Sequence, residues 1–481
     1  MGEVLPHWLD KQALLSPNKI AIELEDGSNI TFSDLQNQSQ TLARQLAGLG
    51  VHASTKVAVL SDNHLDFAIL MHAFSYLQAV AVLLNTKLSN PELTSQLEDA
   101  EASLLITTQT LKQKKSLSFH EQITFSEINK LPVKDIKLAD EIDLSTSFTM
   151  MFTSGTTGKP KMVVHTYGNH WWSANASTLN LGLQQDDKWL LTLPMYHVGG
   201  LSILMRSVIT GMEIFLMEKY SPEVFFDALK NKRITIASIV TVMLKDLLDL
   251  LTSEPLPEKV RCLLLGGSSV PETLLKKVKE KELPLFQSYG MTETSSQIVT
   301  INADNALEKV GSSGKALFPA QLKIENKDEN NVGEIVVKGP MVINRYMNHP
   351  QANKKEFKDG WFKTGDLGYM DKEGFLFVME RRSDLIISGG ENIYPSEVEN
   401  VLLEIEGVQE AAVVAKEDDK WGQVPVAFVV AHKKMTEAMI LADLTSKLAS
   451  FKLPKEINFM KKLPRNATNK IMRHKLQDFL N

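Results

Sequence analysis

The first 120 residues alternate between two hydrophobic periods. Ile20–Leu24 and Lys56–Leu60 show the alternation that is typical of strands. Between them, apolar residues at 35, 42 and 46 recur with a helical period. Ser33 is the expected N-cap of that helix, which is expected to end near Gly48 and Gly50. Strands that alternate with helical runs predict a layered sheet built from β–α–β units.

The longest apolar stretch runs from Phe67 to Leu84. It is interrupted by His72, Ser75, Tyr76 and Gln78. Its later part, Met71–Leu84, therefore predicts a core helix that runs into a strand, and not a membrane span.

Later apolar runs extend this pattern. They predict buried strands at Trp189–Leu193, Glu213–Met217, Ile234–Val240 and Cys262–Leu265. From about residue 311 the pattern changes to short alternating segments with turn residues between them. Gln321–Glu325 and Glu334–Lys338 are two such segments, and they favour a smaller antiparallel β unit.

A third pattern begins after Arg381. Helical runs at Pro395–Glu404 and Glu437–Ser450 accompany strand-like runs at Glu410–Lys416 and Val424–Ala431. The expected fold class is α/β. A large N-terminal domain (1–380) of layered β–α–β subdomains contains the small β unit within about 311–380. A linking segment, 381–384, leads to a small α+β C-terminal domain, 385–481.

Composition narrows the function. The chain has 481 residues, 23% of them charged, and a net charge of −6, which argues against a general nucleic-acid surface. Its one cysteine, Cys262, excludes a disulfide framework or a cysteine-based zinc cluster within the chain, and its apolar surroundings predict a buried strand residue. The N-terminal residues lack the pattern of a signal peptide, so we expect a cytoplasmic protein without stable membrane insertion.

One loop stands out for its chemistry. Apolar runs flank Thr153–Lys161, which reads Thr-Ser-Gly-Thr-Thr-Gly-Lys-Pro-Lys. Its backbone N–H groups, hydroxyls and lysines suit a polyphosphate, although the Walker A spacing is absent. The residues expected to bind are Thr153, Ser154, Gly155, Thr156, Thr157, Gly158 and Lys159. A surface loop without a ligand is the alternative.

The loop resembles the phosphate-binding signature of the adenylate-forming superfamily, which contains acyl- and aryl-CoA synthetases, peptide-synthetase adenylation domains and firefly luciferase. Four further segments match the motifs of that family in order: Gln287–Thr294, Trp361–Asp366, Arg381–Glu397 and Leu463–Lys470. The resemblance thus covers essentially the whole chain. It implies that ATP, Mg²⁺ and CoA are bound.

The motifs suggest individual roles. Ser288 and Tyr289 would bind the nucleotide, with the Tyr289 ring as a surface for adenine. Thr292 would contact a phosphate, and Glu293 would offer an oxygen ligand to Mg²⁺. The ribose hydroxyls would be held by Asp366 and Arg381.

The resemblance also implies a moving C-terminal domain. Lys470 would stabilise the charge that builds up during adenylation. Asp384 would be the hinge, and Gly389 and Gly390 would then approach CoA for the second step. The sequence departs from the family at Asn469 and at Glu380, where glycine is usual.

The acid is indicated by fewer residues. The resemblance places His197 at the gate of the acyl pocket and Gly266, Gly267 and Ser268 along its wall. Arg206, on a helix expected to begin at Leu201, suits a second carboxylate, with a surface arginine as the alternative. The segments His197–Gly211 and Gly266–Leu275 resemble 2-succinylbenzoate–CoA ligases of menaquinone biosynthesis.

Other functions remain open at this point. A medium-chain or other aryl acid–CoA ligase would have a purely apolar pocket. A stand-alone adenylating enzyme would load a carrier protein, and a catalytically dead relative would act as a nucleotide-sensing or scaffolding protein. The expected partners are therefore small molecules, and a homo-oligomer is compatible with the sequence.

Overall fold

The structure is a computed structural model of the chain. It describes residues 2–119, 121–153, 160–251, 255–266, 272–327, 331–380, 386–464, 471 and 473–480. These residues form two compact units. The first contains Met1–Thr86, Leu97–Met151 and Met162–Met379, and the second contains Lys87–Gln96, Phe152–Lys161 and Glu380–Asn481.

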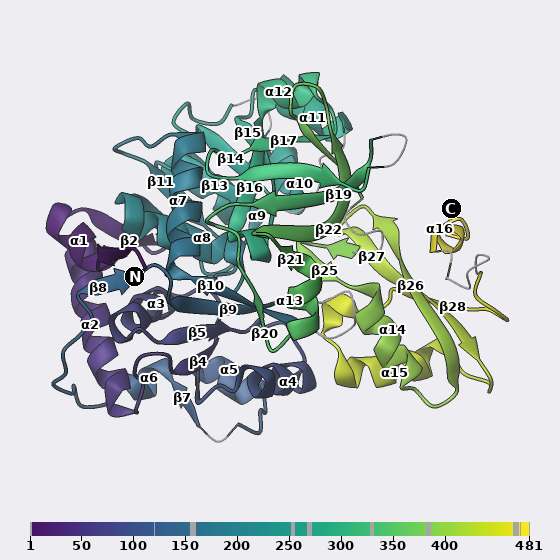
Figure 1. The fold of residues 1–481 in the computed structure, drawn as a ribbon, viewed down its shortest axis with the longest axis horizontal. Coiled ribbons are helices and arrows are strands. Elements are labelled where there is room, and N and C mark those ends of the chain that lie inside the picture. Colours follow the sequence, from purple (N-terminus) through teal and green to yellow (C-terminus); the bar gives the residue numbers. More distant parts are fainter. Residues whose placement is uncertain are drawn as a thin grey trace. The chain divides into compact units, whose positions relative to one another are not determined.

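A seven-stranded sheet forms one layer of the first unit (Figure 1). Its order is β20 (Tyr346–Met347), β10 (Lys161–Thr166), β9 (Ser147–Thr153), β5 (Val80–Leu83), β4 (Lys56–Leu60), β6 (Leu104–Thr107) and β7 (Gln122–Thr124). The strands from β9 to β7 are parallel, whereas β20 pairs antiparallel with β10. The β–α–β prediction for the N-terminal part is confirmed.

The larger sheet of the first unit has a parallel half and an antiparallel half. The parallel strands are β2 (Ile20–Leu24), β12 (Glu213–Leu216), β11 (Lys188–Leu191), β13 (Ile236–Ile239), β14 (Cys262–Leu265) and β15 (Leu285–Met291). At its edge, β3 (Asn29–Thr31) pairs antiparallel with β2.

The antiparallel half continues from β15. It contains β16 (Ser296–Asn302), β17 (Ser312–Ala316), β23 (Leu376–Glu380), β22 (Trp361–Met370), β19 (Gly333–Lys338) and β18 (Gln321–Glu325), with β21 (Phe357–Lys358) on β22. The expected small β unit is thus antiparallel, but it is not a separate sheet. It shares hydrogen bonds with the parallel half because β16 and β17 bridge the two.

Helices cover both sheets of the first unit. They are α1 (Trp8–Leu15), α2 (Phe32–Gly48), α3 (Leu65–Leu77), α5 (Gln109–Lys114), α6 (Phe125–Ile128), α7 (Tyr167–Leu181), α8 (Val198–Thr210), α9 (Pro222–Asn231), α10 (Thr241–Leu250), α11 (Glu272–Glu280), α12 (Ala303–Glu308) and α13 (Pro350–Glu356). Helix α4 (Asn90–Ala100) has residues in both units. A short strand pair, β1 (Val4–Pro6) and β8 (Glu141–Asp143), completes the first unit.

The second unit is built on a five-stranded sheet. Its strands are β25 (Glu391–Ile393), β24 (Ile386–Ser388), β27 (Gly422–Ala431), β26 (Val408–Asp418) and β28 (Glu456–Phe459). Helices α14 (Pro395–Leu403), α15 (Glu437–Lys447) and α16 (Arg473–Gln477) accompany it. The α+β prediction for this region is confirmed.

Two helix starts differ from the sequence predictions. Helix α2 is capped by Thr31 and not by Ser33, because Thr31 and Asp34 form a reciprocal capping box. Helix α8 begins at Val198 and not at Leu201, so its first turn contains two glycines. Gly200 fits there because a Cβ would lie 2.3 Å from the carbonyl oxygen of Pro194.

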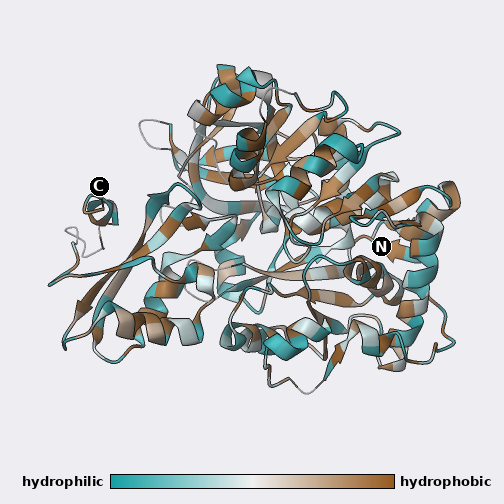
Figure 2. Cartoon of the chain, turned by 180° about the vertical axis from the view of Figure 1, so that it is seen from behind, coloured by the Kyte–Doolittle hydropathy of each residue, from teal (hydrophilic) through white to brown (hydrophobic). Residues whose placement is uncertain are grey.

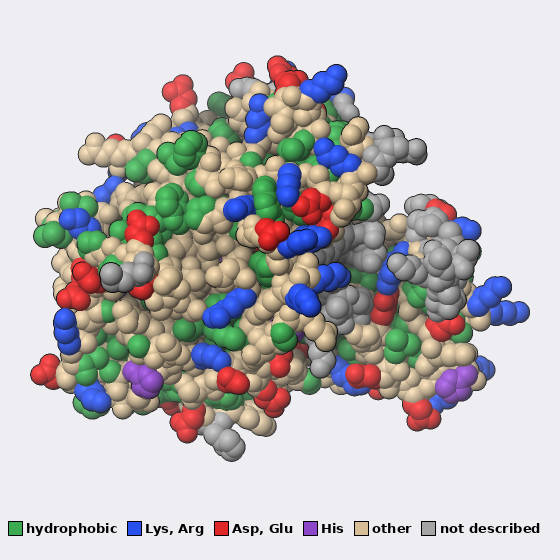
Figure 3. Space-filling view, viewed as in Figure 1, with side chains coloured by type: hydrophobic (Ala, Val, Ile, Leu, Met, Phe, Trp, Pro, Cys, Tyr) green, Lys and Arg blue, Asp and Glu red, His purple; other side chains and the backbone are tan. Residues whose placement is uncertain are grey.

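Burial follows the hydropathy of the chain. Figure 2 shows the central strands as mainly hydrophobic, with hydrophilic residues on outer helices. Residues 67–77 of α3 are all buried, as expected for a core helix. No described helix has the length and apolar character needed to cross a membrane. Acidic and basic side chains both occur across the visible face in Figure 3.

Candidate functional site

Several motif residues of the first unit lie at one edge of the larger sheet. Strands β11, β13, β14 and β15 are parallel, so their carboxyl ends share that edge. Directly after these ends come the His197 segment, Gly266 and the Thr292–Glu293 turn. In open α/β sheets this edge is where ligands bind.

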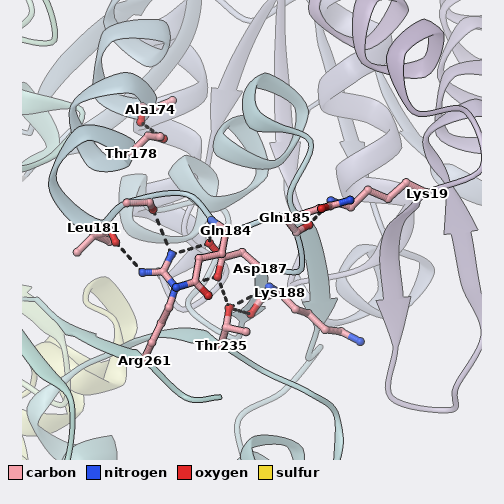
Figure 4. Close-up of polar contacts among 11 residues, drawn as sticks. Lys19, Ala174, Thr178, Leu181, Gln184, Gln185, Asp187, Lys188, Thr235 and Arg261 are labelled. Atoms are coloured by element: carbon pink, nitrogen blue, oxygen red, sulfur yellow. Dashed lines mark hydrogen bonds and ion pairs between the residues drawn. The ribbon is translucent and has the colours of Figure 1, made fainter. Parts of the chain in front are cut away.

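The opposite edge is stabilised by a polar cluster around Asp187 (Figure 4). Arg261 donates from Nε and Nη2 to the two Asp187 carboxylate oxygens, at 2.8 and 2.5 Å. Its Nη1 also donates to the carbonyl of Leu181 at the end of α7, at 2.6 Å. Burial alone would raise the pKa of Asp187, but the hydrogen bonds from Arg261 and from the backbone hold this pKa below its ordinary value. The cluster ties α7 to the strands and has a structural role.

At the carboxyl edge, a short 3₁₀ turn, η1 (Thr292–Thr294), carries Glu293. The Tyr346 hydroxyl lies 3.0 Å from Oε1 of Glu293 and 3.0 Å from Oε2 of Glu356. Burial, and then the two carboxylates, raise the pKa of Tyr346 far above its usual range. The phenol is therefore protonated and can donate.

A chain of buried side chains holds the backbone of the same turn. His165 Nε2 lies 2.7 Å from the Thr292 carbonyl, which can only accept. Burial lowers the pKa of His165 to about 4, so the ring is neutral and its Nδ1 is bare. Nδ1 therefore accepts from the Thr149 hydroxyl at 3.2 Å, and Thr149 Oγ1 accepts from His170 Nε2 at 2.9 Å. Both histidines are fixed as the Nε2–H tautomer.

The backbone after this turn is strained. Ser295 and Ser296 have φ values of 54° and 112°, which residues with a Cβ rarely adopt. Hydrogen bonds impose this path: Ser173 donates to the Ser295 carbonyl at 2.6 Å, and Thr294 Oγ1 donates to the Ser296 carbonyl at 2.7 Å. Gly290 is required opposite, since a Cβ would lie 2.1 Å from the Ser296 oxygen.

Tyr289 and Asp366 are in contact. The Tyr289 hydroxyl donates to Oδ2 of Asp366 at 2.8 Å, and both side chains are buried. Only 2% of Tyr289 is exposed, because its ring packs in the core beside β16 and β19. The ring is therefore not an open surface for adenine in this structure. Its hydroxyl instead fixes the carboxylate proposed for ribose.

His197 and Arg206 lie on the same helix. His197 is the N-cap residue of α8, and its ring packs edge-on against Tyr196 with centroids 4.8 Å apart. Arg206 is only 2% exposed, which excludes the alternative of a surface arginine. Its Nη2 donates to Ser296 Oγ at 3.2 Å, and its guanidinium lies 4.9 Å from the ring centroid of Trp189.

Arg206 has an unusual charge environment. Among the residues that the structure describes, no carboxylate forms an ion pair with it, and its Nε has no hydrogen-bond acceptor. Burial lowers the pKa of Arg206 to about 10, so it is still charged at neutral pH. A buried cation of this kind suits an anionic ligand.

Gly266 follows the end of β14, and Ser288 lies beside it in the middle of the neighbouring strand β15. The Ser288 hydroxyl donates to the Leu265 carbonyl at 3.0 Å, and a Cβ on Gly266 would lie 3.8 Å from Ser288 Oγ. That distance is an ordinary contact, so packing against Ser288 does not by itself demand glycine at 266.

The remaining sequence candidates belong to the second unit or lie outside the described residues. Thr153 ends β9, and its hydroxyl lies 3.5 Å from the Lys161 carbonyl oxygen. Gly389 and Gly390 join β24 to β25 with φ values of 56° and 85°, which explains the choice of glycine. The candidates outside the described residues are Ser154, Gly155, Thr156, Thr157, Gly158, Lys159, Gly267, Ser268, Arg381, Asp384, Asn469 and Lys470.

The donor set around Glu293 limits how a metal ion could bind. Within the described residues there is no group of three or more acidic, histidine or cysteine side chains that could hold one. Mg²⁺ in nucleotide sites is commonly bound by one or two carboxylates together with substrate phosphates. Glu293 fits that mode, because a single hard oxygen donor is enough when the phosphates complete the shell.

Comparison with known sequences identifies the family. The profile described as AMP-binding enzyme matches residues 9–347, and the profile described as AMP-binding enzyme C-terminal domain matches residues 397–470. The chain belongs to the AMP-binding enzyme family. The superfamily inferred from the motifs is thus confirmed.

Individual members of the AMP-binding enzyme family are similar over the full length. The 2-succinylbenzoate–CoA ligase of Oceanobacillus iheyensis is 50% identical over 99% of this chain and 100% of its own. A double mutant of o-succinylbenzoate CoA synthetase from Bacillus subtilis, bound to a product analogue, is 44% identical, with a TM-score of 0.95 over 99% and 98% of the two chains. The same enzyme with ATP and magnesium ion is 43% identical, with a TM-score of 0.78 over 99% and 100%.

The sequence did not predict a role for four residues that contact the candidate site residues of this AMP-binding enzyme: His165, Ser296, Tyr346 and Glu356. His165 follows the glycine-rich loop closely, so a histidine near a phosphate motif was one available signal. Tyr346 contacts Glu293 only through the fold, since 53 residues separate the two, and Glu356 contacts Tyr346.

Proposed function

We propose that this chain is an ATP-dependent, AMP-forming acid–CoA ligase that acts on 2-succinylbenzoate in menaquinone biosynthesis. The likeness to 2-succinylbenzoate–CoA ligases, at 48–50% identity over nearly the full length of each chain, carries this proposal. Arg206 supports the choice of acid, because a buried cation without a carboxylate partner among the described residues suits a dicarboxylic acid.

The reaction has two steps. A carboxylate oxygen of the acid attacks the α-phosphorus of ATP, the bond to the β-phosphate oxygen breaks, and pyrophosphate leaves. The CoA thiolate then attacks the carbonyl of the acyl-adenylate and expels AMP. We assign the aliphatic carboxylate to the reaction, while Arg206 holds the ring carboxylate.

The first unit supplies most of the proposed contacts. Thr292 donates to a phosphate, and Glu293 would hold Mg²⁺, which neutralises phosphate charge when bound. Asp366, fixed by Tyr289, accepts hydrogen bonds from the ribose. Ser288 and Gly266 line the nucleotide and acid sites, and His197 gates the acid site.

The second unit supplies the proposed roles that change between steps. Thr153–Lys159 contacts the phosphates, Arg381 the ribose, and Lys470 the charge of the first transition state. Gly389 and Gly390 approach CoA in the second step, with Asp384 as the hinge. The proposed domain boundary at 381–384 lies next to the start of the last segment of the second unit, Glu380–Asn481. We further propose that the enzyme works in the cytoplasm.

A substrate panel tests the function. Purified protein with ATP, Mg²⁺ and CoA should release AMP at least ~10-fold faster with 2-succinylbenzoate than with benzoate or medium-chain fatty acids. Equal rates with benzoate would refute the choice of acid. A preference for a carrier protein over CoA as the acceptor would favour a carrier-loading enzyme instead.

Lys470→Ala tests the two-step mechanism. Pyrophosphate exchange should fall by at least ~10²-fold, while conversion of supplied acyl-adenylate to thioester should be retained. Lys475→Ala, a change of the same kind in the same basic tail, is the control and should keep both activities. Unchanged exchange in Lys470→Ala would exclude the assigned role.

A further inference from the structure

The carboxylate of Glu293 does not stand alone at the carboxyl edge of the sheet. The Tyr346 hydroxyl lies 3.0 Å from Glu293 Oε1, and it lies the same distance from Glu356 Oε2, at the end of α13. Tyr346 and Glu356 are 2% and 6% exposed. A buried phenol therefore lies within hydrogen-bond distance of two carboxylates.

The number of protons decides what this arrangement can do. A phenol carries one O–H proton, and an ionised carboxylate can only accept. Tyr346 can therefore donate to Glu293 or to Glu356, but not fully to both at once. When Glu293 Oε1 engages another ligand, the hydroxyl can turn to Glu356. The buried O–H then always has an acceptor, which avoids the cost of an unsatisfied donor.

The phenol ring is rigidly held. The Tyr346 N–H donates to Asn353 Oδ1 at 2.7 Å, and Asn353 Nδ2 donates back to the Tyr346 carbonyl at 2.9 Å. Its ring packs against Phe357 and Phe362, with centroids 5.5 and 6.5 Å away. The hydroxyl is thus presented from a fixed point.

The backbone of Glu293 is held as well. The Ile343 N–H donates to the Glu293 carbonyl at 2.9 Å, and His165 holds the preceding Thr292 carbonyl. With the main chain held in this way, the position of the Glu293 carboxylate depends on the side-chain torsions of Glu293. Tyr346 acts on those torsions.

We propose that Tyr346, with Glu356 as its alternative acceptor, positions the Glu293 carboxylate to receive the metal ion of a metal–ATP complex. The proposal rests on the role of Glu293 in the proposed function. Tyr346 and Glu356 are positioning residues, since they act through Glu293 and not on the substrate.

Tyr346→Phe tests the proposal, because it removes one oxygen and keeps the ring. We expect Mn²⁺, measured by electron paramagnetic resonance in the presence of α,β-methylene-ATP, to bind about 10-fold more weakly than in the wild type. Tyr369→Phe is the matched control: its ring stacks on Phe377 at 4.7 Å, and its Mn²⁺ affinity should be unchanged. Thioester formation from supplied acyl-adenylate should stay within about twofold in both variants.

Glu356→Leu is a second, independent test of the proposal. The change removes the alternative carboxylate acceptor of the Tyr346 hydroxyl, so Mn²⁺ should again bind about 10-fold more weakly. Wild-type Mn²⁺ affinity in both Tyr346→Phe and Glu356→Leu would overturn the proposal, as would equal losses in both half-reactions. The substrate panel reads the proposed function separately, because Mn²⁺ binding requires no acid.

Discussion

Arg206→Met separates a substrate-binding arginine from a structural one. In the wild type the side chain is buried without a carboxylate partner in the described part of the chain. Burial lowers its pKa from 12.5 to about 10, which corresponds to a cost of about 3 kcal/mol for keeping the charge inside the protein. The hydrogen bond to Ser296 and the contact with Trp189 return about 1 kcal/mol each.

These terms nearly cancel, so Arg206→Met should change the free energy of unfolding by less than about 1.5 kcal/mol. Arg206 is charged in both the folded and the unfolded state below pH 10. The burial penalty is therefore constant up to that pH and is relieved only as pH rises from about 10 to 12.5. The stability difference between variant and wild type should accordingly not change between pH 6 and 9.

The kinetic effect should be large and selective. A charge-assisted hydrogen bond is worth about 1.5–3 kcal/mol, so kcat/KM for 2-succinylbenzoate should fall about 10- to 150-fold. The analogue 4-oxo-4-phenylbutanoate lacks the ring carboxylate, and its kcat/KM should change by less than about threefold. Urea unfolding and AMP release measure the two effects.

Arg261→Met provides the contrast. It leaves the buried Asp187 carboxylate without its cation, so it should lower the free energy of unfolding by about 3–5 kcal/mol and keep the acid preference. If Arg206→Met behaved in the same way, with equal losses for both acids, Arg206 would be a structural residue and the argument for the dicarboxylic acid would fail.

Three further predictions concern buried groups. Thr149→Val should lower the free energy of unfolding by about 2–4 kcal/mol in urea, because His165 and His170 each lose a buried hydrogen-bond partner. Thr149→Ser keeps the hydroxyl and should restore stability. Equal effects of the two changes would exclude the hydrogen-bond chain. Four buried histidines have lowered pKa values because of burial: His7, His72, His165 and His170. The unfolded state binds their protons near pH 6.5 and the folded state does not. The free energy of unfolding should therefore fall as pH drops from 6.5 to 4, by about 2 kcal/mol per histidine at pH 5. Urea unfolding at each pH measures this change, and a flat profile would contradict it. Burial raises the pKa of Cys262 to about 12, so a thiol reagent should label this cysteine only after unfolding. Rapid labelling of the folded protein would be inconsistent with a buried position on β14.

The regular elements were largely predictable because burial imposes a period. Ile20–Leu24, Lys56–Leu60 and Cys262–Leu265 are strands with the predicted bounds. The start of α8 was missed because glycine pairs usually end helices, whereas Gly200 is needed there for a close approach of two backbones. Such contacts between distant segments leave no local pattern.

The site was predictable as a set of motifs but not as a geometry. Glu293 and Asp366 stand in recognisable segments, yet their hydroxyl partners, Tyr346 and Tyr289, reach them only through the packing of distant segments. The two positive φ angles at Ser295 and Ser296 are also invisible in the sequence, because serine rarely adopts them without tertiary restraint. The motifs identify the candidate site residues, but only the fold shows which side chains position them.

The hydrogen bond from Arg206 to Ser296 has a consequence for attempts to change which acid the enzyme accepts. Ser296 is three residues from Glu293 and lies in the strained backbone that follows η1, the turn that carries Glu293. A designer who replaces Arg206 to accept a new acid also releases one restraint on that backbone. Because that hydrogen bond is worth only about 1 kcal/mol, retargeted variants are expected to carry a small loss in ATP use, within about threefold, whichever acid is chosen. Libraries that vary positions 206 and 296 together should recover efficient enzymes more often than libraries that vary the acid pocket alone.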